Sequence, residues 1–145
     1  MLASMSIFTD AELEFLSAAR TGRLATLSRS GAPQVKAVGF LVDADTGTVD
    51  IPGLDNPSTQ KWRNVQRDAR VALLVDDEGR PGSRWPRSLE IRGRAEALPD
   101  VHPVTAFPGV RPGVIRIHPE RIIVFGVEDD GPGTRDVHPV HAERP

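Results

Sequence analysis

The segment GLDNPSTQKWRNVQRD, residues 53–68, carries the pattern of a helix in the middle of a chain whose other segments are mostly extended. Asn56 is a suitable N-cap, and Pro57 suits the first position of a helix because its missing N–H has no partner there in any case. Trp62 and Val65 recur at helical spacing and give the segment one apolar face. We therefore predict a helix that packs against the body of the protein through these two side chains.

The segments on both sides of this helix read as β-strands joined by turns rich in Gly, Pro and Asp. Strands that follow one another through short turns form an antiparallel sheet. Closing such a sheet into a barrel removes its unpaired edges, so we predict a mainly β fold, a small barrel of about six antiparallel strands. The strand-bearing segments are RLATLSR, PQVKAVGFLVD, TVDI, RVALLVDDEGRPG, RSLEIRGRAEAL and VIRIHPERIIVFGVE, the last holding two runs broken at His118-Pro119.

A further helix is predicted near the N-terminus. Thr9 and Glu12 have the spacing of a capping box, in which each residue's side chain binds the backbone N–H of the other. Leu13 and Leu16 then recur at helical spacing, and Gly22 is a suitable C-cap. These signals place a helix at residues 9–20.

Bulk properties restrict the functional class. The chain has 145 residues, a net charge of -2 and no cysteine, which indicates one domain without disulfides, zinc thiolates or thiol catalysis. A near-neutral charge does not indicate a nucleic-acid or membrane partner, and no secretion signal or transmembrane segment is apparent, so we expect a cytoplasmic protein. We predict a domain at residues 1–128 and, because residues 129–145 lack an apolar period, a flexible C-terminal tail there, disordered or lying on the surface.

The N-terminal end of the central helix has the composition of an anion site. Free N–H groups and a partial positive charge are found at any helix start, and here Ser58, Thr59 and Lys61 add hydroxyl donors and a full charge. The polar side of the helix carries further donors from Gln60, Arg63, Asn64 and Arg67. The same residues would also suit an ordinary amphipathic helix with a basic, solvated face, and spacing alone leaves the two interpretations open.

Other polar residues carry weaker signals. Lys36 shares a strand face with Gln34 and Val38; a lysine in a central strand should be paired or directed at an anion, although an exposed edge position is the simpler interpretation. Trp85 and Arg87 precede a strand, where loops often line binding sites. The arginines of RGR are expected to pair with nearby carboxylates, and the spacing of the histidines fits no metal site.

Four segments in this order resemble a known family: TGRLATLSRSGAPQVKAVGF, STQKWRNVQRDARVALLVDD, SLEIRGRAEAL and IRIHPERIIVFGVE. They are similar to the pyridoxamine 5'-phosphate oxidase-like proteins, and most similar to the actinobacterial branch that uses the deazaflavin coenzyme F420. The resemblance runs from about Phe8 to Glu128, and the K-x-R-N-V-x-R-D-x-R-V motif is its most specific element. It implies a six-stranded antiparallel split β-barrel of the FMN-binding type, with two to three short helices.

The resemblance also implies a homodimer with cofactor sites between the subunits. The strand-to-helix segment would hold the phosphate end of the cofactor, the second strand would pass along its ring system, and the loop before the fifth strand would form the partner wall or substrate mouth. Carried over to this chain, the implied cofactor-binding residues are Gln34, Lys36, Val38, Ser58, Thr59, Gln60, Lys61, Arg63, Asn64, Trp85 and Arg87.

The activity implied is hydride transfer from reduced F420 to a conjugated acceptor, such as a biliverdin-like tetrapyrrole or a quinone. No side chain is identified as a catalytic acid or base; a proton can come from solvent, Lys36 or Arg87. The long acidic tail of F420 calls for several spread-out bases, which Lys61, Arg63, Arg67 and Arg87 offer. Two alternatives stay open, namely an FMN-dependent oxidoreductase of the same fold and a protein that binds a cofactor or tetrapyrrole without turnover.

Overall fold

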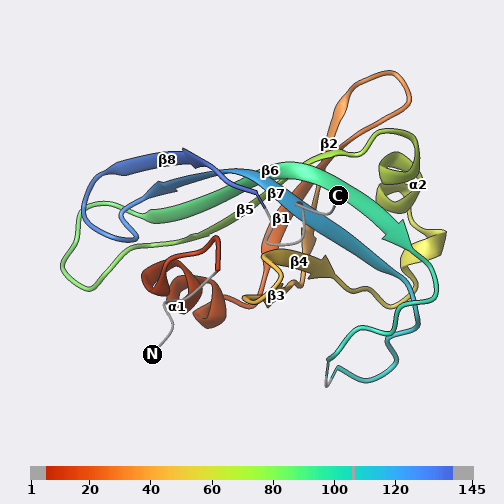
Figure 1. Cartoon of the computed structure of the whole chain (residues 1–145), viewed down its shortest axis with the longest axis horizontal. Helices are drawn as coiled ribbons and strands as arrows, with labels where there is room; N and C mark the ends of the chain where they lie inside the picture. The colour runs from red at the N-terminus through yellow and green to blue at the C-terminus, as the bar shows by residue number, and fades with distance from the viewer. Residues whose placement is uncertain (1–5, 106, 139–145) are drawn as a thin grey trace.

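A computed structural model describes residues 6–105 and 107–138, which form one antiparallel sheet curled into a half-barrel, with two α-helices and a short 3-10 helix (Figure 1). In chain order the elements are α1 (Asp10–Ala18), β1 (Gly22–Leu27), β2 (Pro33–Val38), β3 (Leu41–Asp43), β4 (Thr48–Ile51), η1 (Asn56–Ser58), α2 (Gln60–Arg67), β5 (Arg70–Asp77), β6 (Arg87–Leu98), β7 (Val114–Phe125) and β8 (Pro132–Asp136).

Hydrogen bonds connect the strands in the order β2-β1-β5-β6-β7-β4-β3, and β8 adds to β7. The predicted mainly β, antiparallel, split-barrel class is confirmed. The curled sheet stays open between its edge strands β2 and β3, which are joined only through Gly39 and Phe40. That break divides the second predicted strand in two, and β8 is a strand that the sequence did not predict.

The predicted break at His118-Pro119 is absent, because β7 runs through it as one strand. The register with β6 shifts at this point: Arg92 lies opposite Arg121, whereas the next residue, Gly93, lies opposite Pro119. A bulge places the proline, which has no N–H to donate, where the ladder is already irregular. Gly93 makes room for it, since a Cβ there would lie 2.2 Å from the carbonyl oxygen of His118.

The core fills the concave side of the sheet. Along the long strands, most alternate residues point inward and are buried, as the period of two requires. Trp62 and Val65 of α2 close one end of this core, at 4% and 3% exposure, which confirms the predicted apolar face of that helix. The fully buried strand side chains include Val49, Ile51, Leu73, Val75, Leu89, Ile91, Ile115, Ile117 and Ile122.

Helix α1 is tied to the C-terminal strand by a buried ion pair. The capping box of Thr9 and Glu12 forms as predicted, but the helix ends at Ala18 with Ala19 as C-cap, and Gly22 instead begins β1. Glu12 is fully buried and also accepts hydrogen bonds from Arg135 of β8 at 2.5 and 2.7 Å.

These contacts correct the predicted tail. Pro132–Asp136 pairs along β7, and Val137 beyond it is buried at 7% exposure. The lack of an apolar period was misleading because β8 is an edge strand that uses backbone hydrogen bonds and one arginine rather than an apolar face. The folded domain therefore continues past residue 128, while residues 139–145 lie outside the described part.

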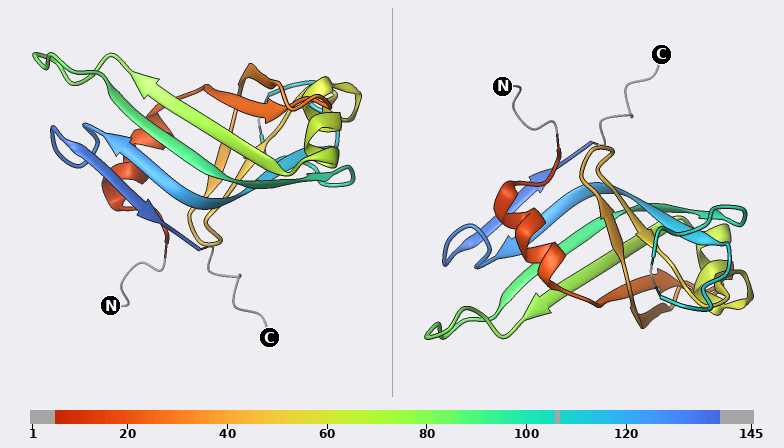
Figure 2. Two further views of the ribbon diagram at one scale, coloured as in Figure 1. Left: turned by 90° about the horizontal axis from the view of Figure 1, so that it is seen from above. Right: turned by 90° about the horizontal axis from the view of Figure 1, so that it is seen from below.

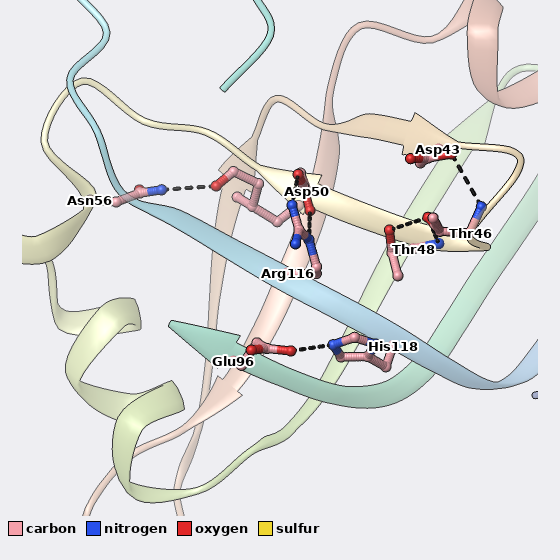
Figure 3. Close-up of polar contacts among 9 residues, drawn as sticks. Asp43, Thr46, Thr48, Asp50, Asn56, Glu96, Arg116 and His118 are labelled. Atoms are coloured by element: carbon pink, nitrogen blue, oxygen red, sulfur yellow. Dashed lines mark hydrogen bonds and ion pairs between the residues drawn. The ribbon is translucent and has the colours of Figure 1, made fainter. Parts of the chain in front are cut away.

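The start of α2 also differs from the prediction. Asn56 lies in η1, and Thr59 is the N-cap of α2, accepting a hydrogen bond from the backbone N–H of Trp62. The side chain of Asn56 is buried and donates to the carbonyl oxygen of Ile51 at the end of β4 (Figure 3). It also donates to the carbonyl oxygen of Gly113, so it ties β4 to the segment before β7.

The outward face of β4, β7 and β6 carries paired charges. Arg116 binds Asp50 through two hydrogen bonds of 2.8 and 3.0 Å, and His118 lies 2.5 Å from Glu96 (Figure 3). Arg92 likewise pairs with Glu90, as expected for the RGR segment, whereas Arg94 forms no ion pair with a carboxylate among the described residues. Among the described residues, no helix is both long and apolar enough to cross a membrane.

Candidate cofactor site

An open pocket of about 430 Å³ lies between the β1–β2 hairpin and the start of α2. Figure 1 shows this helix beside β2 at one end of the half-barrel. The pocket is lined by Thr26, Gln34, Val35, Lys36, Gln60 and Lys61. Four of the predicted site residues thus meet in one place, because antiparallel pairing sets Gln34 opposite Thr26 and α2 packs against that end of the hairpin.

The two lysines give the pocket its charge. Burial lowers the pKa of Lys61 below its ordinary value, and the neighbouring positive charge of Lys36 lowers it further. No carboxylate lines the pocket. Among the described residues, neither lysine has a hydrogen-bonded or ion-paired partner. Lys36 is exposed on the edge strand β2 and Lys61 is half-buried, so a bound anion would relieve a repulsion between the two ammonium groups that solvent already screens in part.

Behind the lysines, a fully buried amide connects the hairpin to the helix. Asn64 donates to Thr26 Oγ1 at 3.0 Å and to Gln34 Oε1 at 2.8 Å. Its own Oδ1 accepts from Gln60 at 2.9 Å and from Arg67 at 3.2 Å. Asn64 therefore takes part in the site from below the pocket floor rather than by lining it.

The two hydroxyls predicted to donate to a phosphate are already used. Ser58 Oγ donates to the carbonyl oxygen of Asp55, and Thr59 Oγ1 donates to that of Asn56 while capping α2. Neither residue lines the pocket. Arg63 is exposed and donates to Ser58 O and to Gln60 Oε1. Both acceptors are uncharged, so they fix the position of the guanidinium without neutralising its charge.

The remaining predicted residues lie elsewhere. Val38 is buried at the far end of β2. Trp85 and Arg87 follow the β5–β6 turn, which both views in Figure 2 place at the opposite end of the half-barrel from α2. Arg87 is held there by Asp77, at 2.5 Å, and lies 5.1 Å from the ring centre of Phe15, while Trp85 stacks edge-on against Phe125. Within one chain they do not join the pocket.

Thr26 belongs to the site but was missed. Its side chain is 3% exposed, lines the pocket and accepts from Asn64. The only available signal was alternation: Thr26 occupies an inward position of a strand whose other inward residues are Gly22 and Leu24, and a hydroxyl at such a position needs a polar partner.

Four basic residues at or beside the pocket have no ion-paired carboxylate. Lys36, Lys61, Arg63 and Arg67 have no carboxylate within ion-pair distance among the described residues, and α2 contains no acidic residue. In contrast, carboxylate partners are present for Arg23, Arg70, Arg87, Arg92, Arg116, Arg121 and Arg135. Arg20, Arg29, Arg84, Arg94 and Arg111 also form no ion pair among the described residues, so what distinguishes the pocket is that two lysines share its lining with no carboxylate, which fits a phosphate-bearing ligand.

A second, more apolar pocket of about 590 Å³ lies where β1 begins and β2 turns into β3. It includes two large apolar side chains that are 62% and 67% exposed, those of Leu54 and Phe107. Both pockets adjoin the β2 segment, the first at Gln34–Lys36 and the second at Gly39–Phe40. At about 3.3 Å per residue, the two stretches of backbone are roughly 10 Å apart.

Comparison with known proteins identifies the family of the chain. The family model described as pyridoxamine 5'-phosphate oxidase matches residues 8–128. The chain belongs to the pyridoxamine 5'-phosphate oxidase family. The resemblance identified from the sequence is confirmed. The matched range contains every element from α1 to β7.

Two relatives specify the branch more closely. A reductase of Streptomyces rimosus, named for 5a,11a-dehydrotetracycline and 5a,11a-dehydrooxytetracycline, is 38% identical over 133 residues, 90% of this chain and 93% of the relative. A solved structure of an F420 reductase is 27% identical with a TM-score of 0.50, covering 68% of this chain and 85% of that one. The chain is therefore an oxidoreductase of the pyridoxamine 5'-phosphate oxidase family.

Other solved structures share the fold. A conserved hypothetical protein of Mycobacterium tuberculosis has a TM-score of 0.63 at 21% identity, covering 87% of this chain and 89% of its own. At that identity the likeness concerns the architecture of the half-barrel alone.

Proposed function

We propose that this pyridoxamine 5'-phosphate oxidase family member is an F420-dependent reductase. The observation that carries the proposal is a pocket lined by Lys36 and Lys61 and by no carboxylate, beside a helix, α2, that adds Arg63 and Arg67 and contains no acidic residue. The pocket would hold the phosphate end of the coenzyme, whose deazaflavin ring supplies a hydride to a substrate stacked against it. The F420 reductase among the similar structures supports this choice.

The distribution of the bases favours F420 over FMN. Lys61, Arg63 and Arg67 span seven residues of α2, about 9 Å along the axis; Arg63 and Arg67, four residues apart, share one side of the helix, and Lys61 lies on another. FMN carries one compact phosphate, which the two lysines alone would satisfy. A longer, polyanionic tail makes use of the arginines as well, because each further carboxylate would find its own unpaired guanidinium.

The residues of the chain would bind and orient rather than perform acid–base chemistry. The ammonium groups of Lys36 and Lys61 would fix the anionic end, while β2 would position the ring system along its length. No catalytic acid or base is assigned, and solvent or Lys36 is the expected source of the proton that completes the reduction. Since Lys61 has a lowered pKa, cofactor affinity should fall as pH rises through that pKa, where this ammonium is lost.

The acceptor is proposed to be an extended conjugated molecule. The relative from Streptomyces rimosus is a reductase of fused-ring dehydrotetracyclines, which supports a planar polycyclic acceptor, alongside biliverdin-like tetrapyrroles and quinones. The apolar pocket next to Gly39 and Phe40 has the volume and lining typical of sites for such molecules.

A homodimer completes the proposal. The outer residues of β2 are exposed throughout, with Val35 at 62%, so this edge offers surface for a second subunit. Because Trp85 and Arg87 lie at the end away from the pocket, they would take part in a cofactor site only through the partner subunit. Sedimentation of the purified chain should report a dimer, and a monomer at micromolar concentration would exclude a site shared between subunits.

Cofactor titration tests the proposal. We would titrate a Trp85→Phe variant with F420 and, separately, with FMN. Trp62 of α2 is then the remaining tryptophan, and the quenching of its fluorescence reports binding. We expect F420 to bind at micromolar concentration, and Lys61→Ala to weaken binding at least tenfold with little change in stability. Arg121→Ala, which removes an exposed arginine from β7, is the matched control.

Two results would reject the assignment. Micromolar binding of FMN without binding of F420 would identify a flavin-dependent oxidoreductase. If F420 binds but its reduced form is not oxidised by dehydrotetracyclines, biliverdin or quinones above the rate without protein, the result would favour a protein that carries the cofactor without turnover.

A further inference from the structure

Arginine side chains determine which way the amides behind the cofactor pocket point. Arg67 donates to one terminal atom of Asn64 at 3.2 Å, and a guanidinium can only donate, so that atom is the carbonyl oxygen Oδ1. The Nδ2 group of Asn64 is then the one that faces the hairpin. It donates to Gln34 at 2.8 Å, and the atom of Gln34 that receives this bond must be Oε1.

The polarity of Gln34 follows from this chain of bonds. With Oε1 occupied by Asn64, the Nε2 group forms the other end of the amide, and it has no partner among the described residues. Gln34 lines the pocket, so the atoms it can offer a ligand there are N–H donors. Asn64 fixes this orientation of the Gln34 amide, because in the reversed orientation the Nε2 of Gln34 would face the Nδ2 of Asn64, and both groups are donors.

Two neighbours are constrained in the same way. Gln60 Oε1 accepts from Arg63 at 3.0 Å, which leaves Gln60 Nε2 to donate to Asn64, so the carbonyl of Gln60 is not available to a ligand. Thr26 Oγ1 accepts from Asn64 at 3.0 Å, and its hydroxyl hydrogen remains to donate. Thr26 lies in the pocket floor and is 3% exposed.

We propose that Asn64 and Arg67 are positioning residues that make this pocket donor-only and therefore selective for a phosphate-type anion. The donors are the ammonium groups of Lys36 and Lys61, the amide of Gln34 and the hydroxyl of Thr26. The unprotonated oxygens of a phosphate accept hydrogen bonds, so one phosphate can take up several of these donors at once. This inference concerns the same pocket as the proposed function, but it holds for any phosphate-bearing ligand.

Inorganic phosphate is the probe that tests this inference without a cofactor. In protein labelled with nitrogen-15, phosphate titrated at neutral pH should shift the side-chain amide resonance of Gln34 with the same dissociation constant as the lysine signals. We expect Asn64→Ala and Gln34→Ala each to weaken phosphate binding about tenfold, the value of one hydrogen bond to a charged group.

A double-mutant cycle separates positioning from general support of the fold. If Asn64 acts through Gln34, the Gln34→Ala/Asn64→Ala double variant should bind phosphate about tenfold more weakly than wild type, like either single variant. Independent effects would multiply to about a hundredfold, and that result would overturn the inference. So would an unchanged Gln34 amide resonance at saturating phosphate.

Arg67 offers a test that does not disturb the buried asparagine. Its side chain is exposed, so Arg67→Met should fold, and this keeps the inference testable if Asn64→Ala does not. Because Gln60 also donates to Oδ1 of Asn64, Arg67→Met should weaken phosphate binding less than Asn64→Ala does, and should have little effect when Gln34 is already alanine. Arg67→Lys, which keeps a donor-only cation, should restore binding, whereas equal loss in both Arg67 variants would contradict the role of the donor.

The phosphate and cofactor experiments fail independently. Phosphate binding with the expected coupling, together with no binding of F420, would leave the donor-only pocket intact and reject the cofactor. Binding of F420, together with independent effects of the Asn64 and Gln34 substitutions on phosphate binding, would support the cofactor and reject the donor-only pocket.

Discussion

Replacing Arg135 with methionine should destabilise the protein far more than the replacement of any exposed arginine. Arg135 donates to both carboxylate oxygens of Glu12, at 2.5 and 2.7 Å, and to the carbonyl oxygen of Ile7 at 2.7 Å. Glu12 is fully buried, so without Arg135 its carboxylate would keep only the N–H of Thr9, 3.0 Å away. Removing one partner of a buried ion pair costs about 3–5 kcal/mol.

That loss is a large part of the roughly 5–15 kcal/mol by which a domain is stable. For a chain of this length it corresponds to a fall in melting temperature of about 10–15 °C. The assay is urea and thermal unfolding followed by circular dichroism. Arg121→Met is the matched control, because Arg121 also joins β7 to β8, through Asp136, but both side chains are largely exposed; it should lose less than about 1 kcal/mol.

The Glu12→Gln/Arg135→Met double variant completes this test. Glutamine can still cap α1, and it removes the buried charge, so the double variant should be more stable than Arg135→Met alone. The reasoning is wrong if Arg135→Met is no less stable than Arg121→Met, or if the double variant recovers nothing. If Arg135→Met does not fold, a folded double variant still supports it.

Further predictions concern charge, a close backbone contact and acid stability. Lys36→Met should raise the pKa of Lys61 toward its ordinary value of 10.5 by removing a neighbouring cation, as measured by NMR of the lysine side chain, and an unchanged pKa would mean that burial alone sets it. Gly93→Ala should cost about 3 kcal/mol or prevent folding, because its Cβ would lie 2.2 Å from a backbone oxygen, whereas Gly39→Ala, with open space around it, should change stability by less than about 0.5 kcal/mol in the same urea assay. The hydrogen bond from its arginine partner lowers the pKa of Asp77 below its ordinary 3.8, so this carboxylate stabilises the fold above that pH and the benefit is lost as pH falls through the lowered value; Asp77→Asn should therefore be less stable than wild type near neutral pH, and the difference should shrink below about pH 3.8. A difference that stays constant on acidification would show that the charge of Asp77 is not what matters.

Local signals predicted much of the fold because they act between residues close in sequence. The capping box at Thr9 and Glu12 and the apolar face of α2 depend only on helical spacing, and both are present in the structure. The strands were found through their period of two. The failures occurred where local patterns compete: Asn56 and Thr59 are both good N-caps, and the choice between them depends on Asn56 being needed to bind Ile51 and Gly113.

The candidate site was predictable in composition but not in detail. Sequence spacing placed Gln60, Lys61 and Asn64 on one helix, and Gln34 and Lys36 on one strand. That these two groups meet is a consequence of how α2 packs on the β1–β2 hairpin. Ser58 and Thr59 have the right side chains for a phosphate, yet their hydroxyls donate hydrogen bonds to nearby backbone carbonyls. That competition depends on the folded conformation of the segment.

The amino-acid sequence by itself determined the mainly β class, the two helices and the basic composition of α2, because periodicity and charge are properties of neighbouring residues. Tertiary structure alone decided which charges remain without a partner. Arg87 and Arg135 are neutralised by Asp77 and Glu12, whereas Lys36 and Lys61 meet across a pocket that contains no carboxylate. Pairing of charges depends on residues distant in sequence, so an anion site becomes visible only once the chain is folded.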